Sequence, residues 1–109
     1  MPIDHWSPTE KKIARRAFDA AYERETAAIM EELRRKVGGM KNSKDLWQIE
    51  KFLRERGDEV ARKYDYRYSQ LIYVFAILYH GGFLVEADLA GLSPDKIDAV
   101  KHTGDCFRR

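Results

Sequence analysis

Residues 45–67, DLWQIEKFLRERGDEVARKYDYR, decide the fold, because apolar residues recur among many charged ones at the period of an α-helix. The apolar stripe comprises Leu46, Ile49, Leu53, Val60 and Tyr64, with Trp47 and Phe52 at its edge. Prolines stand only at positions 2, 8 and 94, so none interrupts this pattern. We predict a long amphipathic helix that begins at Asn42 or Ser43 and ends near Lys63.

A second long helix precedes it and has clear signals at both ends. Ser7 is a helix cap, Pro8 suits the first helical position, and Glu10 completes a capping box three residues after Ser7. Gly38-Gly39 is the expected stop. Its apolar positions are Phe18, Tyr22, Ile29, Leu33 and Val37. The two helices are predicted to be antiparallel.

The segment after the hairpin is predicted to be helical as well. Tyr66–His80 is rich in β-branched and aromatic residues, but its length favours a buried helix over a strand. Asp65 offers a cap and Gly81-Gly82 a stop. A short turn is expected over Glu86–Leu89, and a last helix should begin at Ser93-Pro94.

These elements predict one all-α domain of 109 residues. We expect a long helical hairpin over about 7–64, a small helical head over about 65–102 and a loose tail over 103–109. No internal repeat or linker divides the chain.

The length of the first helix predicts a homodimer. About 30 residues at 1.5 Å each give a helix of roughly 45 Å. A compact globule of about 100 residues has a diameter of only about 34 Å. Because such a globule cannot cover the whole apolar stripe, a second copy of the chain is the simplest cover.

Charge and composition narrow the possible partners and compartments. Twenty basic side chains are offset by 18 acidic ones, so we expect no nucleic-acid partner. The longest apolar run, Leu71 to Tyr79, is too short for a membrane span, and the N-terminus lacks the pattern of a signal peptide. The single cysteine, Cys106, suits a reducing compartment. We therefore expect a cytoplasmic protein.

No pattern of catalytic or metal-binding residues is present in the sequence. His102 and Cys106 stand four apart, but two candidate ligands do not make a metal site. The glycine pairs do not have the spacing of a phosphate loop, and paired acids such as Glu31-Glu32 fall on solvated helix faces. We expect no enzymatic activity, no cofactor and no metal.

Aromatic residues indicate a protein-binding surface instead. Trp47 has three possible roles, which are a core residue, a residue of the dimer seam, or an anchor for a partner. The tyrosines at 64, 66, 68, 73 and 79 are too many for all their hydroxyls to be buried and satisfied. Tyr66 and Tyr73 are the ones that we expect at a surface.

Short segments spread along residues 6–100 match one family in order and in spacing. They are Trp6-Ser7, Ala17-Phe18, Ala21-Tyr22, Arg24-Glu25, Asp45-Leu46-Trp47, Phe52-Leu53, Lys63-Tyr64-Asp65 with Arg67, Val74-Phe75-Ala76, Gly82 with Leu84, and Asp95-Lys96. Together they resemble the fluorescence recovery protein family.

The resemblance implies an all-α homodimer of long helices with a small head and a non-enzymatic role in photoprotection. Members of this family bind the photoactivated, red form of the orange carotenoid protein and accelerate its return to the orange form. It also suggests the residues of the partner-binding surface or dimer seam. These are Trp47, Glu50, Lys51, Arg54, Arg56, Tyr73 and Phe75.

The chain also departs from the family at its functional patch. The family's His-Asp positions carry Glu50 and Lys51 here, and its arginine position falls on Gly57, beside Arg56. A lysine in place of an acid inverts a charge, so a partner matched to the family would meet a like charge. An alternative function is therefore that of a helical adaptor of the same fold with another protein partner.

Overall fold

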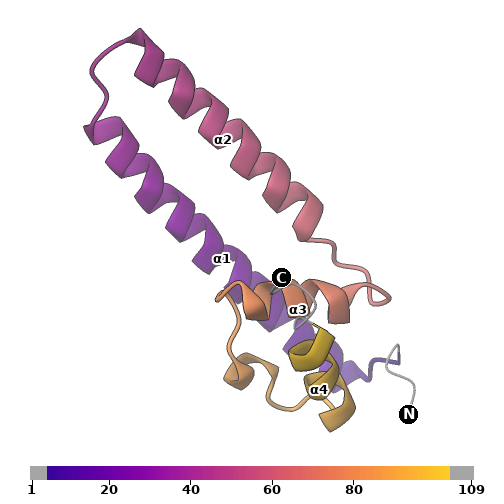
Figure 1. The fold of residues 1–109 in the computed structure, drawn as a ribbon. Coiled ribbons are helices and arrows are strands. Elements are labelled where there is room, and N and C mark those ends of the chain that lie inside the picture. Colours follow the sequence, from indigo (N-terminus) through magenta and orange to yellow (C-terminus); the bar gives the residue numbers. More distant parts are fainter. Residues whose placement is uncertain (1–4, 104–109) are drawn as a thin grey trace.

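The computed structural model describes residues 5–103, which form four α-helices and one 3₁₀ helix (Figure 1). In chain order they are α1 (Pro8–Gly38), α2 (Ser43–Lys63), α3 (Leu71–His80), η1 (Glu86–Leu89) and α4 (Pro94–Thr103). No strand is formed within this described range, so the predicted all-α class is confirmed. Thr103 ends α4, and the rest of the expected tail lies outside the described residues.

The molecule is elongated because its two longest helices form an extended hairpin. The chain measures 57 × 29 × 21 Å along its principal axes. Its radius of gyration is 16.6 Å, whereas a compact domain of this length has one near 13 Å. α1 and α2 lie side by side and antiparallel, as predicted, and their connection forms the end farthest from α3 and α4 (Figure 1).

The ends of the hairpin helices are fixed by local hydrogen bonds. The backbone N–H of Glu10 donates to the Ser7 hydroxyl, and the Ser7 N–H donates to the Glu10 carboxylate, each over 3.1 Å. Gly39 ends α1, its N–H donating to the carbonyl of Arg35 over 3.1 Å. Asn42 is the cap of α2, because its side chain accepts the Asp45 N–H over 3.0 Å.

The helix predicted over residues 66–80 is shorter than expected. α3 begins only at Leu71, and Asp65 does not cap it. The Asp65 carboxylate instead accepts hydrogen bonds from the Arg67 guanidinium. The preceding residues are held outside a helix because the Tyr66 ring packs edge-on against Phe18 of α1, with 4.8 Å between ring centroids.

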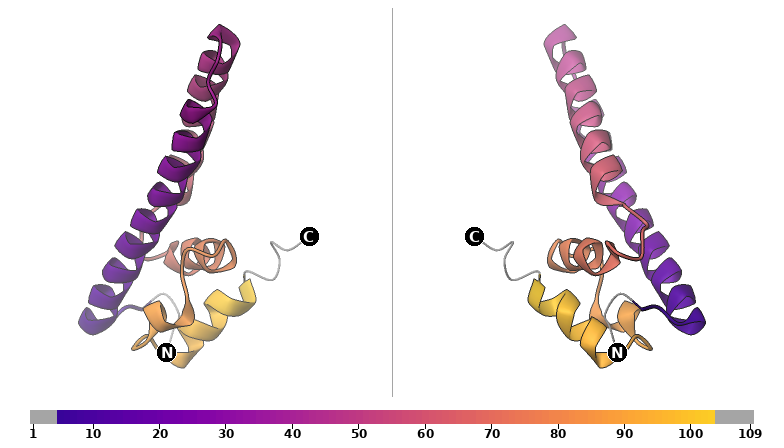
Figure 2. Two further views of the ribbon diagram at one scale, coloured as in Figure 1. Left: turned by 90° about the vertical axis from the view of Figure 1, so that its left-hand side faces the viewer. Right: turned by 90° about the vertical axis from the view of Figure 1, so that its right-hand side faces the viewer.

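The hydrophobic core lies in the head, and the first half of α1 belongs to it. Side views show α3 and α4 on one side of this half of α1 (Figure 2). The buried apolar residues are Trp6, Ala14, Ala17, Phe18, Ala21, Leu71, Val74, Phe75, Leu78, Leu84, Leu89, Leu92 and Val100. None of them comes from α2 or from the second half of α1. The hairpin beyond the head therefore has no apolar core of its own.

Candidate functional site

An apolar groove runs along the hairpin between α1 and α2. It has a volume of about 510 Å³ and is lined by Tyr22, Thr26, Ile29, Leu53, Arg56, Gly57, Val60, Ala61 and Tyr64. Gly57 leaves it open, because no atom lies within 4 Å of the position that a Cβ would take there. Leu53 remains 42% exposed although its side chain belongs to the predicted apolar stripe. We call this groove, with the exposed stripe beside it, the seam.

The first half of α2 presents Trp47 to solvent. Its side chain is 65% exposed, the highest value among the exposed large apolar residues. Within one chain, Trp47 is thus not the core residue that the helical pattern allowed. Lys51 lies one turn further along the helix and is exposed as well. Glu50 and Arg54 pair with each other over 3.3 Å on the surface of the same helix.

Arg56 lies between the two hairpin helices and is not part of the exposed face of Trp47. Its guanidinium is 3.3 Å from the Glu32 carboxylate of α1 and 3.6 Å from Glu59 of its own helix. A third carboxylate, that of Glu25, lies 3.9 Å away. Arg56 therefore ties α2 to α1, which is a role that its place in the candidate site did not suggest.

Glu25 is the centre of a polar cluster that the sequence did not reveal. Its side chain is 2% exposed and accepts hydrogen bonds from the Lys63 ammonium and, over 2.8 Å, from the Tyr64 hydroxyl. Burial and the hydrogen bond to this carboxylate raise the pKa of Tyr64 above its usual value. The only signal in the sequence was that Glu25 and Lys63-Tyr64 both fell in segments of the family pattern.

The two head residues of the candidate site are placed differently. Tyr73 of α3 is 50% exposed, in agreement with the expectation of a surface tyrosine. Tyr66 is only half-buried, and burial raises its pKa to about 12. Phe75 is 0% exposed and belongs to the core, so within one chain it presents no surface to a partner or to a dimer seam, contrary to what its place in the candidate site requires.

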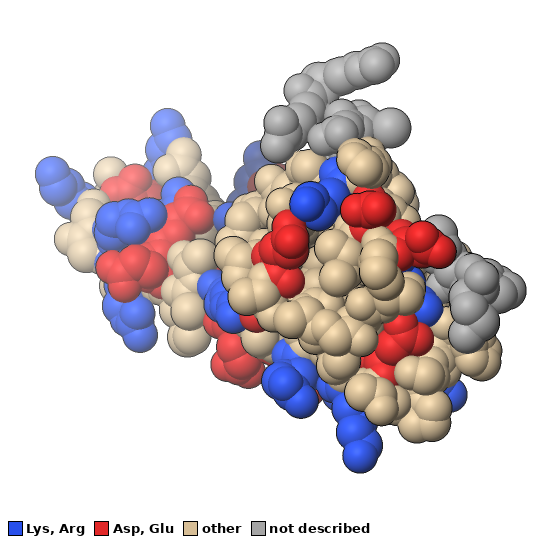
Figure 3. Space-filling view, turned by 90° about the horizontal axis from the view of Figure 1, so that it is seen from below, with Lys and Arg blue, Asp and Glu red and all other residues tan. Residues whose placement is uncertain are grey.

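Two ion pairs hold the head against α1. The Arg24 guanidinium donates to the Asp88 carboxylate over 2.7 and 3.2 Å. The Lys96 ammonium is almost fully buried and donates to the Glu10 carboxylate over 3.1 and 3.2 Å. Seen from the head end, residues without charge cover most of the visible face, and acidic and basic residues lie scattered among them (Figure 3).

Hydrogen bonds shift the pKa values of both carboxylates in these pairs. The bond from Arg24, with a further bond from the Val85 N–H, lowers the pKa of Asp88. Burial raises the pKa of Glu10, but the Ser7 and Ser93 N–H groups together with Lys96 outweigh this effect and lower it. Both groups therefore favour the folded state when they are ionised.

We predict that this stabilisation is lost in acid. A carboxylate with a lowered pKa stabilises the folded state above its unfolded-state pKa, which is 3.8 for Asp88 and 4.5 for Glu10. The free energy of unfolding, measured with urea at fixed protein concentration, should thus fall as the pH drops below about 4.5. Asp88→Asn should cost about 1 kcal/mol at neutral pH and flatten this decline. Asp58→Asn, at an exposed carboxylate, is the matched control, and an equal pH dependence of the two variants would contradict the prediction.

Within residues 5–103, no group of three or more metal-binding side chains comes together. None of the helices in this range is both long and apolar enough to cross a membrane. What the described chain offers is an open apolar seam and exposed aromatic side chains on an all-helical scaffold. Exposed apolar and aromatic surfaces of this kind are typical of helical proteins that bind other macromolecules.

Comparison with known proteins makes this class specific. Residues 6–103 match the family described as photoprotection regulator fluorescence recovery protein. The fluorescence recovery protein of Synechocystis sp. is 32% identical over 96 residues, which cover 88% of each chain. The solved structure of the Fremyella diplosiphon fluorescence recovery protein is 35% identical, covering 94% of this chain and 99% of its own, with a TM-score of 0.86. The Synechocystis structure gives a TM-score of 0.88 at 31% identity, over 93% and 99% of the two chains.

The chain therefore belongs to the fluorescence recovery protein family, whose members are photoprotection regulators. The match includes the hairpin and the head together, so it extends to the relative arrangement of α1 and α2 with the smaller helices. The resemblance read from the sequence is confirmed.

Proposed function

We propose that this chain is a homodimeric, non-enzymatic regulator that binds the photoactivated form of an orange-carotenoid-type protein and accelerates its return to the orange form. Its membership of a family of photoprotection regulators over residues 6–103 is the observation that carries this proposal. The exposed Trp47 supports it further, because the tryptophan of the family's functional patch is present and accessible. We place the protein in the cytoplasm.

The homodimer is supported by the lack of a core in the hairpin. α2 has 21 residues, none of which is buried within one chain. Leu46, Leu53 and the apolar groove beside them are left to solvent. Each buried leucine contributes about 1.5–3 kcal/mol, so a second hairpin that covers this seam would stabilise both copies.

A second function, that of an adaptor for another protein partner, is favoured by Lys51 and Gly57. Lys51 is exposed on the same helix face as Trp47, so its inverted charge would be felt by a bound partner. Gly57 provides no side chain for an arginine-like contact and opens the seam instead. Under this alternative the fold and the dimer stay, and only the partner changes.

The proposal is tested by following the orange carotenoid protein in the dark after illumination. Substoichiometric amounts of the chain should accelerate the red-to-orange change in absorbance. A relative from the family serves as the positive control. Absence of any acceleration and of any complex, with the relative active in the same assay, would exclude the carotenoid function and leave the adaptor.

We predict that Trp47→Ala separates folding from binding. Because the ring is 65% exposed, its removal should change the free energy of unfolding by less than about 1 kcal/mol. Binding of the partner should fall at least about tenfold, since exposed tryptophans often anchor an interface. Val85→Ala, at another exposed apolar position, is the control and should change neither quantity. A large loss of stability in Trp47→Ala would show that the dimer buries the ring.

A further inference from the structure

The end of the hairpin farthest from the head carries the excess positive charge of the molecule. Residues 33–51, which end α1 and begin α2, contain six lysines and arginines but only two carboxylates, Asp45 and Glu50. The whole chain has 20 basic and 18 acidic side chains, so the remainder has a small negative balance. We call residues 33–51 the basic tip.

Most of these charges are not used inside the described chain. Lys44 and Lys51 form no ion pair with any residue of the range 5–103. Asp45 keeps its negative charge but forms no ion pair with them; its carboxylate accepts the backbone N–H of Lys41 over 3.0 Å. Glu50 is paired with Arg54. The tip therefore presents unbalanced ammonium groups to solvent.

Trp47 lies among these charges on a face of α2 that is distinct from the seam. Lys44, Trp47 and Lys51 are spaced three and four residues apart, so they share one helix face. At 100° per residue, the centre of this face lies about 160° around the helix from the face of Leu53 and Val60, and Trp47 itself lies about 130° from it. A second copy that covers the seam would thus leave Trp47 accessible.

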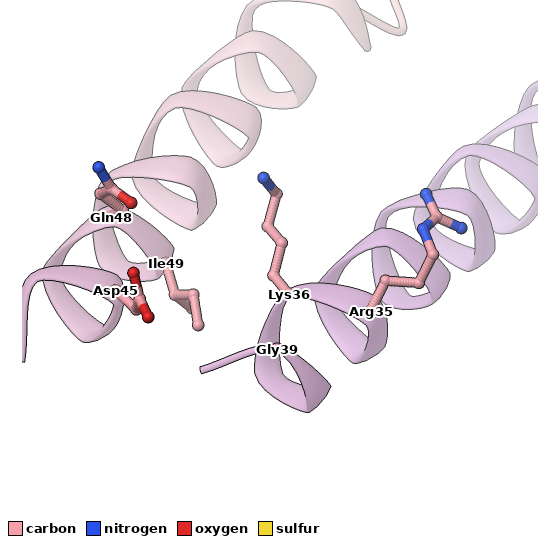
Figure 4. A pocket seen from close by; sticks show the side chains of 6 residues that line it. All are labelled: Arg35, Lys36, Gly39, Asp45, Gln48 and Ile49. Carbon is pink, nitrogen blue, oxygen red and sulfur yellow. The ribbon is translucent and has the colours of Figure 1, made fainter. Parts of the chain in front are cut away.

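A hollow with both basic and acidic lining residues lies between the helix ends near this face. It has a volume of about 260 Å³ and is lined by Arg35, Lys36, Gly39, Asp45, Gln48 and Ile49. Lys36 extends into the space between α1 and α2, whereas Arg35 is turned away from it (Figure 4). Gln48 is next to Trp47 and so joins the hollow to the exposed face. The hollow is thus mixed in charge, with the Lys36 ammonium and the Asp45 carboxylate both among its lining groups. The exposed face of Lys44, Trp47 and Lys51 therefore carries the positive character of the tip.

The charges of the tip decide what could cover it. Two copies that paired their tips around a two-fold axis would bring like charges together, which is unfavourable. In the head of a second copy, Asp65, Glu86 and Asp88 already form ion pairs within their own chain. Asp95 and Asp98 are the exposed carboxylates of the described head that form none, and they are too few to balance the six basic side chains of the tip. A partner with its own carboxylates satisfies both the ammonium groups and the exposed ring.

We propose that the basic tip docks an acidic protein surface, with Trp47 entering an apolar patch of the partner and Lys44 and Lys51 facing carboxylates around it. This inference rests on the proposed function as a protein-binding regulator and names the chemistry of its partner. It makes Lys51 a determinant of partner choice, since its charge selects acidic surfaces and rejects basic ones.

Fluorescence of Trp47 tests the chemistry without the natural partner. Trp6→Phe removes the other of the two tryptophans and leaves Trp47 as the reporter. Titration with a peptide of repeated Glu-Glu-Phe should shift its emission to shorter wavelength, and high salt should weaken this binding at least about tenfold. A Lys-Lys-Phe peptide of equal length should cause no shift. Equal responses to both peptides would overturn the proposal.

Matched charge reversals locate the binding surface. Lys44→Glu with Lys51→Glu should weaken binding of the acidic peptide at least about tenfold. Lys12→Glu with Arg62→Glu changes the net charge equally at exposed positions outside the tip and should weaken it less than about threefold. Circular dichroism verifies that each variant is folded. If the Lys44→Glu, Lys51→Glu variant does not fold, Lys44→Gln with Lys51→Gln removes the two charges without reversing them. Equal losses in the two pairs would overturn the assignment to the tip.

Three further measurements test what else could cover the basic tip, namely a second copy of the chain, a lipid surface or the orange carotenoid protein. A shift of Trp47 emission when the dimer is diluted to monomers would place the ring in the seam and overturn the proposal. Tighter binding to vesicles of phosphatidylglycerol than to the acidic peptide would identify a lipid surface instead. Photoactivated orange carotenoid protein should lose affinity in the Lys44→Glu, Lys51→Glu variant if its docking surface is acidic. A gain of affinity in this variant would show that Lys51 meets a like charge on that protein and would overturn the proposal for it. If the unmodified chain does not bind that protein while the peptide results hold, the carotenoid function fails and the acidic docking surface stands.

Discussion

Leu53→Asp should convert the dimer into monomers. In one chain Leu53 is 42% exposed at the apolar groove between α1 and α2, and in the proposed dimer it faces the second hairpin. A carboxylate buried there without a partner costs several kcal/mol, and the two-fold axis introduces two of them. The dissociation constant should rise at least about hundredfold. Light scattering at low micromolar concentration should report a mass near 12.8 kDa instead of about twice that value.

The control for this prediction is Val85→Asp. Val85 is 55% exposed in the head, so the same change of an apolar residue to an acid occurs away from the seam. This variant should remain dimeric. If both variants stay dimeric, the second copy does not use the groove, and if the unmodified chain is itself a folded monomer, the homodimer proposal fails.

Local rules were sufficient to predict the ends of the hairpin helices. Ser7 with Glu10 closes the start of α1, and Gly39 closes its end, through hydrogen bonds between residues that are three or four apart. Such contacts depend on neighbouring residues alone, so the sequence contains all that is needed to predict them. Asn42 is a similar case, since its side chain reaches the Asp45 N–H.

The start of α3 could not be predicted from local rules. Tyr66 packs against Phe18, 48 positions earlier in the sequence, and Tyr64 packs against the same ring with 5.3 Å between centroids. These contacts between distant segments hold the backbone before Leu71 out of a helix, while the periodicity of the segment would allow one. The sequence contains several neighbouring tyrosines that could each pack against α1, and it does not show which of them do so.

Only part of the candidate site could be predicted, because the depth of a side chain also depends on contacts between distant segments. A helical period assigns residues to faces but does not give their depth, and Trp47 and Phe75 therefore had comparable patterns. The fold leaves Trp47 exposed on the hairpin and buries Phe75 completely in the core of the head. Glu25 escaped notice because an acid among many charged residues gives no sign of burial, and only the approach of α2 brings Lys63 to it.

Phe75→Ala should cause the largest loss of stability among single changes in the head. Its ring is completely buried, so the substitution removes apolar contacts and leaves a cavity. The expected cost is about 3–5 kcal/mol, compared with a total stability of about 5–15 kcal/mol for a domain of this kind. Urea denaturation followed by circular dichroism should therefore show a much lower midpoint. Phe75→Leu, which retains most of the volume, should cost less than about 1.5 kcal/mol.

Tyr73→Ala provides the comparison on the same helix, because Tyr73 is 50% exposed two residues away. It should lower the free energy of unfolding by about 1 kcal/mol at most. If Tyr73 contacts a partner, as its place in the candidate site suggests, its loss should weaken the complex while the head stays folded. Phe75→Ala should weaken the complex only to the extent that it unfolds the head. At a temperature where both variants are folded, Tyr73→Ala should therefore weaken binding and Phe75→Ala should not. A stable Phe75→Ala variant with impaired binding would return Phe75 to the interface and show that the head opens to admit its partner.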